Sequence, residues 1–149
     1  MATAIRAALE GWPELTTVFV ATDEANFLES LGESFCGRRV ISTESERSRG
    51  RLALHLTGPG SMRRAQEALM DAHLLARTQL VVKTASALSA WAGFLAPELP
   101  VLVLNDLYTG VRLPWFPVEA RSSVEMTASD IARHAATARA RAQTRTLPK

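Results

Sequence analysis

Short runs of apolar and β-branched residues alternate with segments of helical periodicity along this chain, and this alternation constrains its fold more than any other feature. Four runs have the character of buried strands: Thr16–Thr22 (TTVFVAT), Arg38–Thr43 (RRVIST), Gln79–Thr84 (QLVVKT) and Pro100–Asn105 (PVLVLN). Strands that are apolar on both faces belong to parallel sheets with helices on either side. The pattern therefore predicts an α/β fold, a Rossmann-like doubly wound parallel sheet.

Helical segments separate these runs. The expected helices are Ala4–Glu10, Asp23–Phe35, Ser61–Arg77 and Ser86–Leu95. A last helix should start at a capping box formed by Thr127 and Asp130. In the third helix, Leu69 and Ala72 belong to one apolar side, whereas Asp71 lies off that side, where contact with solvent is one of its two alternatives and a binding role the other.

The size and composition of the chain fit one globular domain, since 47% of its 149 residues are hydrophobic. We expect residues 1–126 to form this domain and residues 127–149 to add a helix and a basic tail that frays. Residues 43–60 are polar and predict a surface loop that holds a weak strand, LALHL. Trp115 and Phe116 in the LPWFP segment either close over the core or offer a stacking surface.

The distribution of charge argues against a nucleic-acid-binding domain. The net charge is +2, but five basic residues and no acidic ones follow Ile131. The remainder carries 12 basic residues against 15 acidic ones, so the body of the protein is mildly acidic. No membrane segment is expected either, because Lys83, Pro97 and Glu98 interrupt the most apolar region.

Several kinds of active site lack their sequence signals. Cys36 is the only cysteine, and neither a D-x-D motif nor a histidine cluster suggests a metal site. The chain also has no Walker A motif, no G-x-G-x-x-G fingerprint and no G-x-S-x-G elbow. We therefore expect no metal and no NAD or ATPase chemistry.

The carboxyl ends of the predicted strands are the places to look for a ligand. Asp23 follows the first strand and either accepts hydrogen bonds from a nucleotide or caps the next helix. Thr84 and Ser86 lie where the third strand passes into a helix, in VVKTASALSAW. They either cap that helix or hold a phosphate on its free N–H groups, and spacing alone does not choose between these roles.

Four segments in this order resemble the nucleotide-sugar-binding half of the α1,6-fucosyltransferase and nodulation-fucosyltransferase-like glycosyltransferases. They are VFVATDE (Val18–Glu24), ALMDAHLLARTQLVVKTASALSAWA (Ala68–Ala92), PVLVLN and LPWFP. The second segment is the most specific: an aspartate, a histidine two residues later, a leucine-rich turn, an apolar strand and a Thr/Ser joint. The resemblance implies half of a two-domain GT-B architecture.

The resemblance also implies a function and a set of site residues. The function is metal-independent transfer from GDP-fucose or a related nucleotide sugar to a hydroxyl of a glycan or protein. Carboxylates at Asp23 and Asp71 would contact the guanosine, and the start of the helix after Thr84 would hold the diphosphate. The implied site comprises Asp23, Asp71, His73, Thr84, Ser86, Ala87 and Leu88.

The chain departs from this family in two places. Ser86-Ala87 stands where the family often has paired serines, and Arg6 is the only arginine before Asp23, where a His-x-Arg-like catalytic segment is expected. We therefore expect a truncated donor domain that binds its nucleotide with little turnover. The alternative is a non-catalytic half-Rossmann interaction module, which would expose an apolar edge to a partner domain or a second copy.

Overall fold

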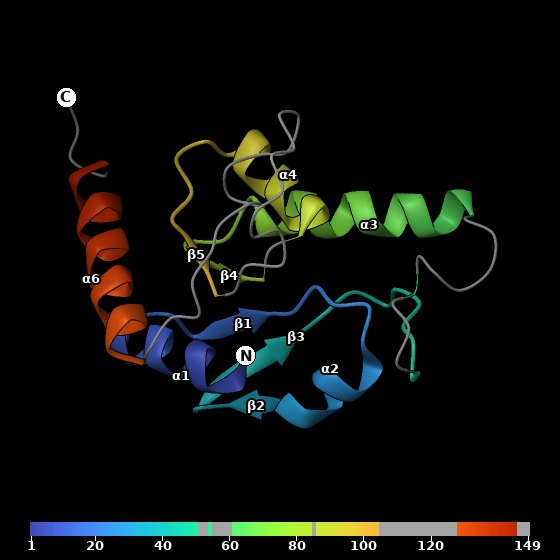
Figure 1. The fold of residues 1–149 in the computed structure, drawn as a ribbon, viewed down its shortest axis with the longest axis horizontal. Helices are drawn as coiled ribbons and strands as arrows, with labels where there is room; N and C mark the ends of the chain where they lie inside the picture. Colours follow the sequence, from blue (N-terminus) through green and yellow to red (C-terminus); the bar gives the residue numbers. More distant parts are fainter. Residues whose placement is uncertain (51–53, 55–60, 85, 105–127, 146–149) are drawn as a thin grey trace, which may run out of the picture.

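The chain folds into helices and short parallel strand pairs, an α/β architecture (Figure 1). The computed structural model describes residues 1–50, 54, 61–84, 86–104 and 128–145. In chain order the elements are α1 (Ala2–Gly11), β1 (Thr17–Phe19), α2 (Ala25–Leu31), β2 (Ser34–Phe35), β3 (Arg38–Ile41), α3 (Met62–Leu75), β4 (Val81–Lys83), α4 (Ala87–Leu95), β5 (Val101–Val103) and α6 (Ala128–Arg145). All four predicted strands are present at their expected places, each shorter than its apolar run.

The strands form two sheets. In the first, β1 pairs in parallel with β3 and β3 pairs antiparallel with β2, with Val18 opposite Val40. In the second, β4 pairs in parallel with β5, with Val82 opposite Leu102. Among the described strands no hydrogen-bonded pair joins β1 to β4, so the parallel pairing that the sequence predicted occurs in two separate units.

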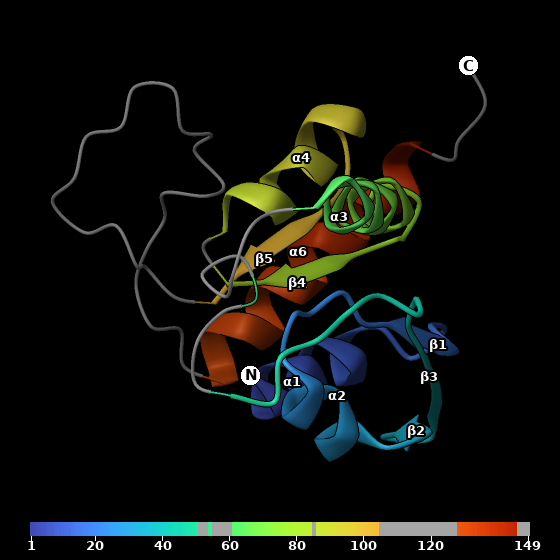
Figure 2. The ribbon, with the colours of Figure 1, turned by 90° about the vertical axis from the view of Figure 1, so that its right-hand side faces the viewer.

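Helices lie on both sides of the β4–β5 pair. Figures 1 and 2 show α3 and α4 on the side away from the first sheet, and α1 and α6 contact β4 and β5 from the other side. The core on that side is built from small and branched residues of α1, α6 and the β5 segment: Ala4, Ala7, Ala8, Leu102, Leu104, Ile131 and Ala135. Leu80 and Val82, at and beside β4, are partly buried and pack against it. Alanines on α1 let the two helices approach the short strands closely.

The predicted last helix is present, and it extends through the basic segment after Ile131 as far as Arg145. Ile131 and Ala135 are buried against α1. One helical turn later, Arg139 donates to the Gly11 carbonyl at 3.2 Å and pairs with Glu14 at 3.1 Å. This spacing of four residues puts one face of α6 on α1, and packing compensates for the modest intrinsic stability of the helix.

The segment after α2 forms a hairpin where the sequence predicted helix as far as Phe35. The helix ends at Leu31 because Gly32 adopts a φ of 64°, which few residues other than glycine reach easily. The two-residue turn between β2 and β3 is formed by Cys36 and Gly37, both with positive φ, the geometry of a tight hairpin.

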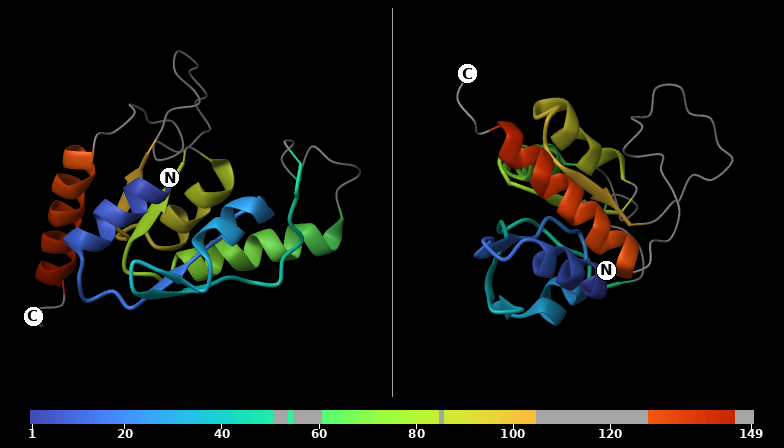
Figure 3. Two further views of the ribbon diagram at one scale, coloured as in Figure 1. Left: turned by 90° about the horizontal axis from the view of Figure 1, so that it is seen from below. Right: turned by 90° about the vertical axis from the view of Figure 1, so that its left-hand side faces the viewer.

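Helix α3 packs against α4 rather than burying its whole apolar side (Figure 3). Ala72 is buried, whereas Leu69 is 55% exposed. Ser61 caps the helix by accepting a hydrogen bond from the Arg64 N–H at 3.1 Å. The predicted LALHL strand (apart from Leu54), the LPWFP segment and the Thr127 cap lie outside the described residues.

No helix in the described part of the chain is long and apolar enough to cross a membrane.

The contact between α1 and α6 should tolerate little added volume. A Cβ placed on Gly11 would lie 3.0 Å from the Cβ of Ala135, and neither atom can rotate away. We expect Gly11→Ala to lower the free energy of unfolding by about 1–3 kcal/mol through overpacking. Urea denaturation followed by the fluorescence of the buried Trp12 measures this change.

A second substitution isolates the contact itself. Ala135→Gly removes the opposing methyl group, so the double variant should be more stable than the sum of the two single effects allows. Additive effects, or a Gly11→Ala protein as stable as the wild type, would show that the helices adjust without cost.

Candidate functional site

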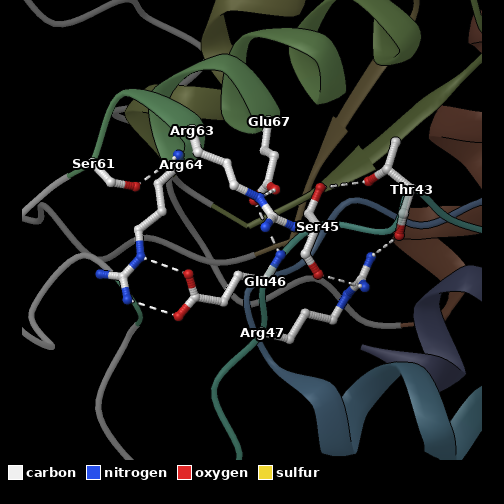
Figure 4. A network of polar contacts seen from close by, with 8 residues as sticks. All are labelled: Thr43, Ser45, Glu46, Arg47, Ser61, Arg63, Arg64 and Glu67. Carbon is white, nitrogen blue, oxygen red and sulfur yellow. Dashed lines mark hydrogen bonds and ion pairs between the residues drawn. The ribbon is translucent and has the colours of Figure 1, made fainter.

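A polar segment, residues 43–50, runs between the two carboxylates that the sequence singled out. It follows β3 and passes the start of α2, where Ser48 forms an isolated parallel bridge with Glu24. Its side chains also join a network of hydrogen bonds and ion pairs with α3 (Figure 4). We call it the polar segment; it belongs to the region that the sequence predicted as a surface loop.

Asp23 is bound to this segment by its main chain and to Leu54 by its side chain. The Ser48 N–H donates to the Asp23 carbonyl at 2.7 Å, and the Leu54 N–H donates to the carboxylate at 3.0 Å. Asp23 is not the cap of α2, since Glu24 occupies that position. Thr22 accepts a hydrogen bond from the Glu24 N–H at 3.1 Å and so orders the turn before the helix.

Asp71 is buried, so the alternative in which it contacts solvent is wrong. The side chain points from α3 toward the polar segment, where the Thr43 hydroxyl donates to Oδ1 at 2.8 Å. Burial raises the pKa of this carboxyl, while the Thr43 hydrogen bond and the nearby Arg47 charge act in the opposite direction. The position off the apolar side of α3 was recognised from sequence, but the segment that covers it was not.

Arg47 is the second polar group of this cluster. Its guanidinium donates to the carbonyls of Thr43 at 2.7 Å and Ser45 at 3.0 Å, which fixes it along the main chain of the segment. Its Nε is buried and is the one such side-chain atom among the described residues that has no hydrogen-bond partner. A buried donor without a partner costs free energy, so this atom is an exception among the described polar groups.

Ion pairs fasten the polar segment to α3. Glu46 forms two hydrogen bonds with Arg64, at 2.7 and 2.9 Å, and its N–H donates to Glu67 at 3.1 Å. Glu67 in turn pairs with Arg63 at 2.7 Å. The hydrogen bond from Arg64 holds the pKa of Glu46 below its ordinary value. These pairs are exposed, so their effect is to fix geometry more than to add stability.

The joint between β4 and α4 contains the other predicted residues. Ser86 is the N-cap residue of α4 by position, but its side chain makes no capping hydrogen bond. Its carbonyl accepts from the Ser89 hydroxyl at 3.2 Å. Thr84 is half-buried at the end of the strand, and the backbone of Ala87 and Leu88 opens the helix. The side chains of Ala87 and Leu88 lie outside the described part.

Lys83 was missed by the sequence analysis as a site residue. It is the last residue of β4, it is 5% exposed, and its Nζ lies 3.4 Å from the Ser86 carbonyl. A buried ammonium group is rare unless it is paired, and this one lies at the carboxyl end of a parallel strand, beside the start of a helix. The signal in the sequence is a lysine inside an otherwise apolar run.

His73 is exposed, whereas Asp71 two residues earlier is buried. Residues two apart on a helix point to different sides, so these two do not form a pair. Asp23 and Asp71 are thus both bonded to the polar segment. The structure groups Lys83, Thr84 and Ser86 with the start of α4, and His73 belongs to neither group. Within the described chain there is no group of three or more residues that could hold a metal ion.

Comparison with known proteins assigns no relative to the chain. A scan against protein-family models gives no match, and searches of curated proteins and of solved structures give none.

The burial of Asp71 makes stability depend on pH in a defined direction. Its pKa is higher in the folded protein than in the unfolded chain, so in the pH range between the two values the folded state binds more protons. The free energy of unfolding should therefore fall as pH rises through this range and level off above it. Asp71→Asn should remove this dependence, and urea denaturation at several pH values between about 4 and 8 measures it.

Thr43→Val provides the companion variant. It removes the donor to Asp71 and should cost about 1–3 kcal/mol at neutral pH, where the carboxylate is left without that partner. Equal pH slopes for the wild type and Asp71→Asn would contradict the burial of this carboxyl.

Proposed function

We propose that this chain is a nucleotide-sugar-binding domain of glycosyltransferase type, with GDP-fucose or a related GDP-sugar as its donor. The observation that carries the proposal is the buried Lys83 at the carboxyl end of β4, next to the start of α4. A cation and free helix N–H groups at one strand end are the combination that binds a diphosphate. The resemblance of the sequence to fucosyltransferase-like enzymes supplies the identity of the nucleotide.

The diphosphate would bind at the joint. The uncapped N–H groups of α4 and the hydroxyls of Thr84 and Ser86 would donate to its oxygens. Ala87 has no hydroxyl to donate, and Lys83 supplies a positive charge beside the helix dipole. In a transferase, this charge would stabilise the nucleoside diphosphate as it leaves the sugar.

The nucleoside would bind to Asp23 and Asp71, the two carboxylates beside the polar segment. A carboxylate accepts up to about four hydrogen bonds, so the bond from Thr43 leaves Asp71 able to accept more. Guanine presents two neighbouring N–H donors, which match the two oxygens of one carboxylate, whereas adenine and uracil do not offer this pair. This chemistry favours GDP over ADP and UDP.

The strand pairs are compatible with half of a GT-B architecture. In one doubly wound strand order, 2-1-3-4-5, the first strand lies between the second and the third; here β1 pairs with β3, and β4 pairs with β5 after a helical crossover. Pairing of β1 with β4 would give the order β3-β1-β4-β5, with Asp23 and the joint at neighbouring carboxyl ends. The complete reaction would also need an arginine and an acceptor site of the kind found in the family, with a glycan or protein hydroxyl as acceptor.

Nucleotide titration tests the proposal. By calorimetry, the chain should bind GDP more tightly than UDP or ADP, and Lys83→Met should weaken GDP binding about tenfold because it removes a charge-assisted bond. Arg39→Met, on an exposed position of β3, is the matched control and should bind GDP as the wild type does. No preference for GDP at millimolar concentration would rule out the guanine assignment.

A second candidate function is an interaction module without catalysis, and an exposed apolar patch favours it. Trp91 and Phe94 on α4 are 55% and 61% exposed, with their ring centroids 5.5 Å apart. They lie beside an apolar hollow of about 220 Å³, which is lined by Trp91 and by Ala65, Ala68, Leu69 and Ala72 of α3. Exposed patches of this kind often mark protein contacts.

Light scattering separates the two candidates. An interaction module should be a dimer in solution that Trp91→Ser and Phe94→Ser convert to a monomer, with no affinity for nucleotides. A monomeric wild type that binds GDP would exclude this second function.

A further inference from the structure

The face of α6 that points away from α1 lines a groove. One wall is formed by Arg133, Thr137, Arg141 and Thr144. The other is formed by residues 97–102, which comprise the connection after α4 and the first residues of β5. The groove has a volume of about 670 Å³, too large for a single small anion and within the range of ligand sites. The opposite face of α6, with Ile131, is occupied by the core, so the two faces of the helix have different roles.

Two arginines give this groove a defined spacing of positive charge. Arg133 and Arg141 are eight residues apart on the helix, a distance of roughly 12 Å along its axis. An extended peptide covers this distance in about four residues. Carboxylates four residues apart on an extended chain would therefore meet both guanidinium groups.

The remaining polar groups in the groove suit a peptide. The Thr137 hydroxyl donates to the Arg133 carbonyl at 3.0 Å, and the Thr144 hydroxyl donates to the Arg141 carbonyl at 2.9 Å. In this arrangement each hydroxyl oxygen is left to accept, which suits the N–H groups of a peptide. Glu98 lines the groove as well, and a peptide can place an uncharged residue beside it.

The opposite wall adds apolar surface. Pro97, Leu99 and Pro100 belong to it, together with Val101 and Leu102 at the start of β5. Apolar side chains between the acidic positions of a ligand would bury this surface.

We propose that this groove binds an extended acidic peptide segment of a partner protein, with carboxylates about four residues apart and apolar residues between them. The binding surface is separate from the proposed nucleotide site, and the proposal does not depend on that function. Arg133 and Arg141 set the register, the two threonines accept main-chain N–H groups, and the 97–102 wall receives the apolar side chains.

Fluorescence anisotropy with the full chain tests the proposal. The probe is a labelled peptide with two glutamates four residues apart and leucines between them, and its control has glutamines in their place. The glutamate peptide should bind at least about threefold more tightly than the glutamine peptide, and Arg141→Glu should weaken it by about three- to tenfold. Arg77→Glu, an exposed site after α3, makes the same charge change outside the groove and should have little effect.

A charge exchange makes the test specific to position. A peptide with lysine in place of the glutamate that faces Arg141 should bind Arg141→Glu more tightly than the original peptide does, and should bind the wild type more weakly. Lysine in place of the other glutamate should not restore binding to Arg141→Glu. Circular dichroism establishes that each variant remains folded. Equal losses for Arg141→Glu and Arg77→Glu, or tighter binding of a single-stranded oligonucleotide of matched charge, would overturn the proposal.

Discussion

Close packing of the first and last helices against β4 and β5 is the constraint on which the described structure depends. The core at this place is built largely from alanines, and alanine buries little surface, so its contribution comes from short distances between backbones. Gly11 marks a close approach, where even one methyl group has little room. The same packing holds the basic helix α6 against α1 and leaves its other face directed away from α1.

The polar half of the molecule is organised by the polar segment and not by a sheet. Asp23 and Asp71, far apart in sequence, are each bonded to main-chain or side-chain groups of residues 43–54. Glu46 and Arg64 fix this region to α3 by a two-bond ion pair. Because one segment holds both carboxylates, a change at Thr43 or Ser48 would affect each through the same piece of chain. The proposed nucleotide chemistry therefore relies on a loop, with the helices as its support.

The sequence predicted the structure correctly where the spacing of apolar residues matches the burial of those residues in the fold. The strand positions, the extent of α3 and the absence of a long apolar helix among the described residues follow from short apolar runs and helical spacing. It failed where a distant segment decides the environment of a residue. The burial of Asp71 was not predicted because the covering segment reads as a polar loop, and Lys83 was passed over because a lysine at a strand end usually reaches water. Among the described strands, β1 and β4 are not paired. The apolar runs predict where strands form but not which strands pair, so nothing in the sequence indicated this.

The contact between α1 and α6 also has a consequence for the order of folding. Arg139 donates to the Gly11 carbonyl across a separation of 128 residues, so this part of the core forms only when two remote segments meet. Closing so long a loop is entropically costly, and contacts of this range slow folding. The β1–β3 pair and the α3–α4 contact join nearer neighbours and can form earlier. The pair β4–β5 should therefore remain uncovered on one face until late, and that interval is when its apolar residues are most exposed to aggregation.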